Sequence, residues 1–214
     1  MLSKSAFLGS LGIVLGLFVA DSAGETRNQT ALSYVDQGDK FAHAGDFDRA
    51  ISAYNIALQF VPDFAPAFLH RAFAEEARGD VSKAIADYTS ALETVPSLTT
   101  ALYNRGNLRL NQGDLDAALS DFDKALKSDP RYVMAYNNRG IAKLGKRDLK
   151  GAMDDFNEAI RIDPHHPEAY VNRGLLELQQ GLKAEAERDF ARSIAVRPSL
   201  KSFIQGRVRQ ISQN

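Results

Sequence analysis

The sequence predicts an all-α fold in which helical hairpins stack into an α-solenoid. Three observations support this prediction. Prolines recur at one spacing, small side chains and aromatic rings recur in the same register, and Gly-Asp pairs stand between the prolines. The chain has 214 residues, of which 44% are hydrophobic and 25% are charged, so it is long and apolar enough to bury a substantial core.

The proline spacing defines a repeat of 34 residues. Five of the seven prolines keep it without an insertion or deletion: Pro62, Pro96, Pro130, Pro164 and Pro198. A fixed period of this length indicates a repeat architecture, in which each unit buries its apolar face against the next. We therefore expect five repeats, at 31–64, 65–98, 99–132, 133–166 and 167–200.

Within each repeat, small residues and large rings take fixed places. The eighth place holds Gly38, Ala72, Gly106, Gly140 and Gly174, and the twenty-fourth holds Tyr54, Tyr88, Phe122, Phe156 and Phe190. Alanine occupies the twentieth place throughout, and the twenty-seventh in every repeat except the last, which has Ser193. Such alternation of small sites and rings is what two closely packed helices require.

The two helices of each repeat are predicted to meet at a Gly-Asp turn. Repeats one to three have Gly45-Asp46, Gly79-Asp80 and Gly113-Asp114 at corresponding places. Glycine takes the left-handed conformation that ends a helix, aspartate caps the next helix, and the proline stops that second helix. Repeat four has Arg147 before Asp148 and repeat five has Gly181 before Leu182, so these turns are less well specified.

This pattern resembles the tetratricopeptide repeat family, in segments such as ALYNRGNLRLNQGDLDAALSDFDKALKSDP and AYNNRGIAKLGKRDLKGAMDDFNEAIRIDP. The resemblance covers residues 31–200 and implies a right-handed superhelix of helix-turn-helix units. One departure concerns the eleventh place, which is usually aromatic in the family. Here it holds Phe41, Glu75, Arg109, Lys143 and Glu177. We expect the aliphatic stems of the four charged residues to pack in place of a ring.

The residues after the last repeat are predicted to form a capping helix. Leu200, Ile204, Val208 and Ile211 form an apolar stripe at helical spacing. A helix with one apolar face closes the end of a solenoid. We assign the capping helix and tail to 201–214.

The first residues have the three-part layout of a secretory signal. Lys4 precedes a largely apolar run from Ala6 to Ala20, and small residues follow. The run is shorter than the roughly 20 apolar residues that span a bilayer, which favours a cleaved signal over a permanent anchor. We expect a signal peptide at 1–24, a linker at 25–30, and export to the periplasm or secretion. The alternative is an uncleaved anchor that tethers the same domain outside the cytoplasm.

Arginine and aspartate occur together at two further places of repeats two to five. The seventh place holds Arg71, Arg105, Arg139 and Arg173, and the twenty-third holds Asp87, Asp121, Asp155 and Asp189. Repeat one has neither. This joint presence and absence predicts a structural ladder of ion pairs. A row of arginines that binds anionic ligands is the alternative.

The resemblance also implies a binding surface, because in that family the first helices of successive hairpins line a concave face. At the fifth, sixth and ninth places it assigns Val35, Leu69, Phe73, Tyr103, Asn104, Asn107, Asn138, Ile141, Asn172 and Leu175 to this face. An apolar strip beside amides suits an extended segment or an amphipathic helix of a protein partner. The asparagines at the sixth place resemble the ladder with which some family members hold a peptide main chain. Hydrogen bonds to local backbone or water are the alternative role.

Other kinds of chemistry are not indicated. Lys plus Arg number 26 against 27 Asp plus Glu, with the signs mixed along the chain, so nucleic acid is not an expected partner. The sequence has no cysteine, phosphate-binding glycine loop, zinc-spaced histidine pair or serine-elbow motif, so we expect no catalytic residues, no metal and no cofactor. We interpret the turn that contains Asp163, His165, His166 and Glu168 as solvated, and a site for a divalent cation is the alternative.

We therefore expect an exported, non-enzymatic scaffold that binds a protein or peptide. A holding chaperone for exported clients is the alternative, and a ligand-binding protein or enzyme is a weaker one. The carboxylate clamp that holds chaperone tails in related domains needs cations where this chain has Tyr103 and Glu168, so we do not expect that partner. The first repeat lacks an obvious preceding cap, which makes it the expected surface for a homo-oligomer.

Overall fold

The computed structural model describes residues 22–213, which form eleven α-helices, one short 3-10 helix and no strand. The expected signal peptide lies outside these residues, except that positions 22–24 begin the first helix. That helix, α1, runs from Ser22 to His43. Residues 25–30, for which we expected a linker, are therefore helical. Neither proline nor glycine interrupts this stretch, and the Thr30 hydroxyl donates to the Thr26 carbonyl at 2.8 Å.

The helices follow the register of the prolines. The first helices of the pairs are α1, α3 (Ala65–Arg78), α5 (Thr99–Asn111), α7 (Val133–Gly145) and α9 (Pro167–Gln179). The second helices are α2 (Phe47–Phe60), α4 (Val81–Thr94), α6 (Leu115–Ser128), α8 (Leu149–Ile162) and α10 (Lys183–Val196). A 3-10 turn, Pro198–Leu200, leads to α11 (Lys201–Ser212). From α3 to α11, the first helices begin 34 residues apart, so the proline spacing is also the helix spacing.

Glycine in the left-handed region ends the first helix of four pairs. The φ angle is 79° at Gly45, 90° at Gly79, 81° at Gly113 and 82° at Gly181. In the α7–α8 turn Arg147 takes this conformation instead, with φ at 63°. The turn geometry is therefore kept even where the sequence lacks its preferred residue.

Aspartate then caps three of the second helices. The Asp46, Asp114 and Asp148 carboxylates each accept a hydrogen bond from the backbone N–H three residues later, at 3.1, 3.2 and 2.9 Å. Asp80 makes no such bond, and its carboxylate lies 3.0 Å from the Arg78 guanidinium. The cap predicted for α4 is thus replaced by an ion pair.

The rings at the twenty-fourth place form the centre of each helix pair. Tyr54, Tyr88, Phe122 and Phe156 have no exposed surface. Where the eighth place is glycine, its backbone lies against the ring. A Cβ added at Gly140 would stand 2.6 Å from Cε1 of Phe156. The pairing of small and large residues read from the sequence is therefore a direct contact.

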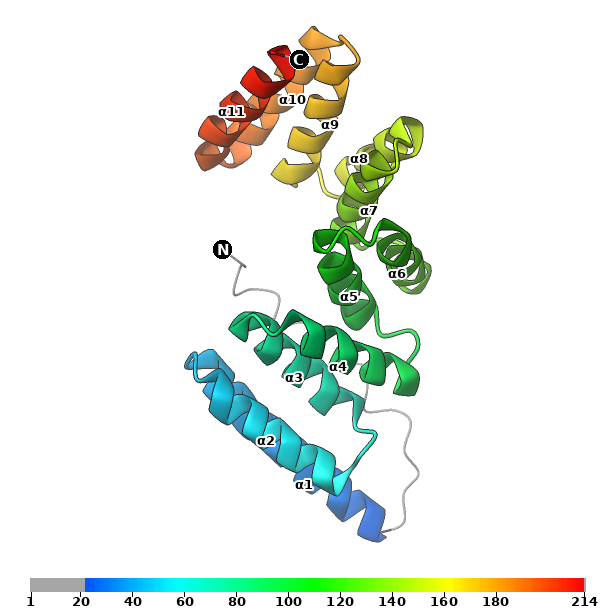
Figure 1. Ribbon diagram of the computed structural model, residues 1–214, viewed down its shortest axis with the longest axis vertical. Helices are drawn as coiled ribbons and strands as arrows, with labels where there is room; N and C mark the ends of the chain where they lie inside the picture. The colour runs from blue at the N-terminus through cyan, green and yellow to red at the C-terminus, as the bar shows by residue number, and fades with distance from the viewer. Residues whose placement is uncertain (1–21, 214) are drawn as a thin grey trace. The chain divides into compact units, whose positions relative to one another are not determined.

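The chain divides into two compact units within α5. The N-terminal unit extends to Arg105 and the C-terminal unit begins at Gly106. In the N-terminal unit, α1 packs along α2 and α3 along α4. In the C-terminal unit, α7 packs along α8 and α9 along α10 (Figure 1). Each unit is thus built from helical hairpins, in agreement with the predicted fold class.

The predicted capping helix is α11, and its apolar stripe packs against the last helix pair. Ile204 is buried in a cluster with Val171, Ala186 and Phe190. Leu200 and Val208 pack against the same cluster. The stripe therefore covers apolar side chains of α9 and α10 that would otherwise face solvent.

Candidate functional site

Two of the residues assigned to the binding face belong to the core of the N-terminal unit. Val35 is 2% exposed and Leu69 is 4% exposed. Val35 lies in a cluster with Ala31, Tyr54 and Ala67, so the fifth place points between the helices at these two positions. The assignment of Val35 and Leu69 to an exposed face was wrong.

Three other assigned residues of this unit keep partial exposure. Phe73 packs edge-to-face on Tyr88, with ring centroids 5.7 Å apart. Tyr103 and Asn104, on α5, are also half-buried. In the N-terminal unit, these three are therefore the assigned residues that remain partly exposed.

A polar cluster that the sequence did not reveal joins α1, α2 and α3. Oδ1 of Asp39 accepts the Tyr54 hydroxyl at 2.7 Å and lies 2.6 Å from Nδ1 of His70. His70 is 8% exposed. Burial, followed by the hydrogen bond to Asp39, raises the pKa of Tyr54, so its hydroxyl stays protonated and donates. The cluster connects the ninth place of one hairpin with the sixth place of the next.

The same two places meet in the C-terminal unit through amides. Nδ2 of Asn138 donates to Oδ1 of Asn107 at 3.1 Å. Nδ2 of Asn137 donates to Oδ1 of Asn138 at 3.0 Å, and Nδ2 of Asn172 donates to Oδ1 of Asn137 at 2.8 Å. The four side chains form a continuous row from α9 through α7 to α5, which we call the amide row.

Three members of the amide row were assigned from the sequence, and Asn137 was missed. Asn137 is 6% exposed and occupies the fifth place. Other repeats have Val35, Leu69 or Val171 there, so a lone asparagine at an apolar place was the available signal. A buried amide needs hydrogen-bond partners, and Asn138 and Asn172 supply them.

Aliphatic side chains stand on the same helices as the amide row. Ile141 is half-buried and packs against Ala152, Phe156 and Leu176. Leu175 is half-buried and packs against the cluster that contains Val171 and Phe190. The C-terminal unit therefore combines amides with partly exposed aliphatic groups, and the role of these residues as a binding face stays a prediction.

In the α3–α4, α7–α8 and α9–α10 pairs, the arginine of the seventh place binds the aspartate of the twenty-third. Nε and Nη2 of Arg71 donate to the Asp87 carboxylate, both at 2.6 Å. Arg139 holds Asp155 in the same way at 2.9 and 2.6 Å, and Arg173 holds Asp189 at 2.6 and 2.8 Å. The hydrogen bonds to Asp87 raise the pKa of Arg71. These guanidiniums are thus engaged by carboxylates of their own hairpins.

All four arginines of the seventh place, Arg105 included, also donate a hydrogen bond to the preceding hairpin. Nη1 of Arg139 donates to Asp123 at 2.7 Å, and Nη1 of Arg173 donates to Asn157 at 2.7 Å. Nη1 of Arg105 donates to the Thr89 hydroxyl at 2.9 Å. The acceptors share the twenty-fifth place, which the sequence analysis had not singled out because its residue type varies.

Comparison with known proteins identifies the family. A family model described as "Tetratricopeptide repeat" matches residues 31–98, 103–167 and 156–199. The chain belongs to the tetratricopeptide repeat family. No curated protein matches the sequence.

Solved tetratricopeptide structures show the same fold at low sequence identity. MamA is 24% identical, with a TM-score of 0.71 over 82% of this chain and 96% of that one. PilF of Pseudomonas aeruginosa is 18% identical, with a TM-score of 0.70 over 87% of this chain and 90% of that one. YrrB, described as a TPR protein with an unusual peptide-binding site, is 16% identical, with a TM-score of 0.71 over 91% of this chain and 99% of that one.

The ladder accounts for two of the four charged residues that depart from the tetratricopeptide pattern at the eleventh place. Nη1 of Arg109 lies 2.7 Å from Oδ2 of Asp121, and Nζ of Lys143 lies 2.8 Å from Oδ2 of Asp155. The charged heads of these residues thus meet the aspartate of the twenty-third place. We had expected only their aliphatic stems to pack.

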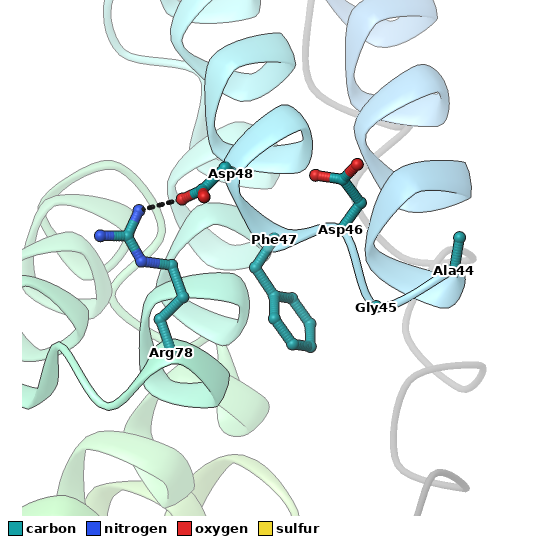
Figure 2. Close-up of a pocket in the computed structure, with 6 residues that line it drawn as sticks. All are labelled: Ala44, Gly45, Asp46, Phe47, Asp48 and Arg78. Carbon is teal, nitrogen blue, oxygen red and sulfur yellow. Dashed lines mark hydrogen bonds and ion pairs between the residues drawn. The ribbon is translucent and has the colours of Figure 1, made fainter.

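Two open cavities lie outside the amide row. One, of about 480 Å³, is lined by the first turn and by Arg78, whose Nη1 donates to Asp48 at 2.7 Å (Figure 2). The other, of about 520 Å³, is lined by Phe190 and by residues of α11. The first is closed on one side by an ion pair and the second is mainly apolar, so neither gathers reactive groups.

Neither a metal-binding cluster nor a membrane-spanning helix is found within residues 22–213. There, no three histidine, aspartate or glutamate side chains are grouped so as to hold a metal ion. In the turn that contains His165, burial lowers the pKa of His166, and its Nδ1 lies 3.7 Å from Glu168. None of the helices between residues 22 and 213 combines the length and apolar character needed to cross a bilayer.

Proposed function

We propose that this tetratricopeptide protein is a non-enzymatic scaffold that binds an extended segment of a protein partner. The observation that carries the proposal is the amide row of the C-terminal unit, with Ile141 and Leu175 on the same helices. Carboxamides both donate and accept hydrogen bonds, so they can pair with the main chain of any polypeptide. Partly exposed aliphatic side chains add burial of the partner's apolar groups.

The N-terminal unit supplies a second group of candidate contacts in this proposal. Phe73 and Tyr103 offer ring edges, and Asn104 offers an amide. The peptide-binding site named for YrrB supports a peptide as the class of ligand. The mixed charge of the chain and the acidic Glu168 argue against nucleic acid and against a carboxylate-clamp chaperone tail.

Affinity capture from the native compartment tests the binding face. Ile141→Glu combined with Leu175→Glu should abolish capture of a discrete partner, because two carboxylates would be placed beside the amide row. The matched control is Leu149→Glu with Leu182→Glu, at the beginning of α8 and just before α10 in the same unit, where the two residues are 42% and 45% exposed. Circular dichroism establishes that both variants are folded.

The outcome separates the candidate functions. A partner that is lost only in the first variant supports the scaffold. Capture of many unrelated proteins would favour the holding chaperone, and equal capture by both variants would reject the face.

We further propose that the protein is exported, with the apolar run of residues 6–20 as its signal. Sequencing of the N-terminus of protein recovered from outside the cytoplasm tests this, and retention of Met1 would contradict cleavage. Self-association through α1 and α2 is part of the same proposal. Sedimentation at several protein concentrations measures it.

A further inference from the structure

The eleventh place of each hairpin decides how the buried aspartate of the twenty-third place is neutralised. In the α5–α6 and α7–α8 pairs this place holds a cation, Arg109 or Lys143, within 2.8 Å of the aspartate. In the α3–α4 and α9–α10 pairs it holds Glu75 or Glu177. The same geometry therefore brings a second carboxylate to two of the buried aspartates.

The α3–α4 pair has too few positive charges for two ionised carboxylates. Arg71 is already bound by both oxygens of Asp87. Glu75 lies one turn after Arg71 on α3 and is 7% exposed. Its Oε2 is buried and has no hydrogen-bond partner within the described part of the chain. An uncompensated buried charge is costly, so this site favours a neutral carboxyl group.

The neighbouring helices compensate the charge of Glu75 only in part: the charge of Lys83 lowers the pKa of Glu75, but less than burial and Asp87 raise it. Lys83, on α4, has a side chain that is 65% exposed. From α1, Asp39 is bound to His70, and from α2, Asp48 is bound to Arg78. From α5, Arg105 donates to Thr89.

We propose that Glu75, Asp87 and Arg71 form a proton-binding site that links the packing of α3 on α4 to pH. With a proton on Glu75, the cluster holds one negative and one positive charge. Without it, two carboxylates share one guanidinium inside the hairpin. Loss of the proton therefore loosens α3 from α4.

The raised pKa of Glu75 determines how the stability of the folded state changes with pH. Burial, and then the charge of Asp87, raise its pKa from 4.5 to about 7. Because the folded state holds the proton more tightly than the unfolded state, this stabilisation is fully present below about pH 4.5. It is lost as the pH rises through about 7.

The α9–α10 pair repeats the arrangement. Arg173 binds both oxygens of Asp189, Oε1 of Glu177 lies 4.0 Å from Nε of Arg173, and Oε2 of Glu177 is buried without a partner within residues 22–213. Burial, followed by Asp189, raises the pKa of Glu177.

The charges around Glu177 on the packed helices are accounted for. From α10, Glu185 raises its pKa and Arg188 lowers it, and these two are paired at 2.8 Å. From α7, Arg139 and Lys143 are bound to Asp155. From α8, the uncharged Asn157 accepts a hydrogen bond from Arg173, and the cations of α11 are exposed: Lys201, Arg207 and Arg209.

Thermal or denaturant unfolding of the full chain at about pH 5 and about pH 8 tests the proposal. Glu75→Gln should leave the unfolding equilibrium almost unchanged at the lower pH and favour the folded state by about 10- to 100-fold at the higher pH. Glu93→Gln, at an exposed position of α4, is the matched control and should show no such difference.

Two further variants exchange the acidic and basic residues of the eleventh place between the α3–α4 and α7–α8 hairpins. Glu75→Lys copies the α7–α8 arrangement and should also remove the pH dependence. Lys143→Glu should create the dependence in α7–α8, and it is informative even if the Glu75 variants fail to fold. Equal effects of Glu75→Gln at both pH values, or a Lys143→Glu variant without new pH dependence, would overturn the proposal. Neither result bears on the binding face, because partner capture is not measured.

Discussion

Among residues 22–213, Arg147 is the single non-glycine residue with a positive φ angle. Its φ angle of 63° lies in the left-handed region that the other first-helix ends fill with glycine. A β-carbon in this region crowds the following carbonyl group, which costs about 1–2 kcal/mol. The neighbouring turn still forms because Asp148 caps α8 and the Arg147 N–H donates to the Leu144 carbonyl.

Arg147→Gly should therefore raise the free energy of unfolding by about 1 kcal/mol, which denaturant titration measures. Arg147→Ala is the control, since it removes the same charged group but keeps the β-carbon. If alanine stabilised the protein as much as glycine, the guanidinium and not the backbone would be the source of the strain.

At the scale of the element, a glycine packs closely on a ring in four of the five helix pairs. The α7–α8 pair brings the backbone of Gly140 against Phe156, which has no exposed surface. The ring is held on its other sides by Ala152 and Leu176. It has little room to move away from a larger residue.

Gly140→Ala should lower the free energy of unfolding by about 1–3 kcal/mol, because the added methyl group would force the ring or the helix to shift. Gly206→Ala makes the same chemical change in α11, where nothing lies within 4 Å of the new atom. That variant should gain about 0.5–1 kcal/mol from helix propensity. Thermal unfolding of both variants measures the difference, and equal signs would refute the packing argument.

The arginine ladder acts at the largest scale, because three of its arginines each join three successive helices within one unit. Arg71 joins α2, α3 and α4, and Arg139 joins α6, α7 and α8. Arg173 joins α8, α9 and α10. Arginine side chains thus hold the two helices of one hairpin together and also connect that hairpin to the preceding one.

A double-mutant cycle of Arg139→Ala and Asp155→Ala should give a coupling energy of about 1–3 kcal/mol, since the two groups share two hydrogen bonds and Asp155 is 3% exposed. Denaturant titration of the four proteins measures it. Additive losses would show that the pair is adjacent without being coupled.

The parts of this structure that depend on local chemistry could be predicted from the sequence. Gly45 and Asp46 determine a turn whatever surrounds them, and Pro62 ends a helix by its own geometry. The charged residues of the ladder were also predictable, because two places varied together within one chain.

The parts that depend on neighbouring helices could not be predicted. Whether Leu69 faces the core or the surface depends on how α3 is rotated against its neighbours. The bond between Asn137 and Asn172 depends on two hairpins meeting. The charged head of Lys143 finds Asp155 for the same reason.

The amide row has a direction. Every bond in it is donated the same way, from Asn172 on α9 to Asn137, then to Asn138, and finally to Asn107 on α5. The carboxamide dipoles are therefore aligned, and such chains polarise one another. The row ends in the amide nitrogen of Asn107 on α5 and in the carbonyl oxygen of Asn172 on α9. One end therefore carries a partial positive charge and the other a partial negative charge. A bound peptide segment that lies along the row would meet a hydrogen-bond donor at one end and an acceptor at the other.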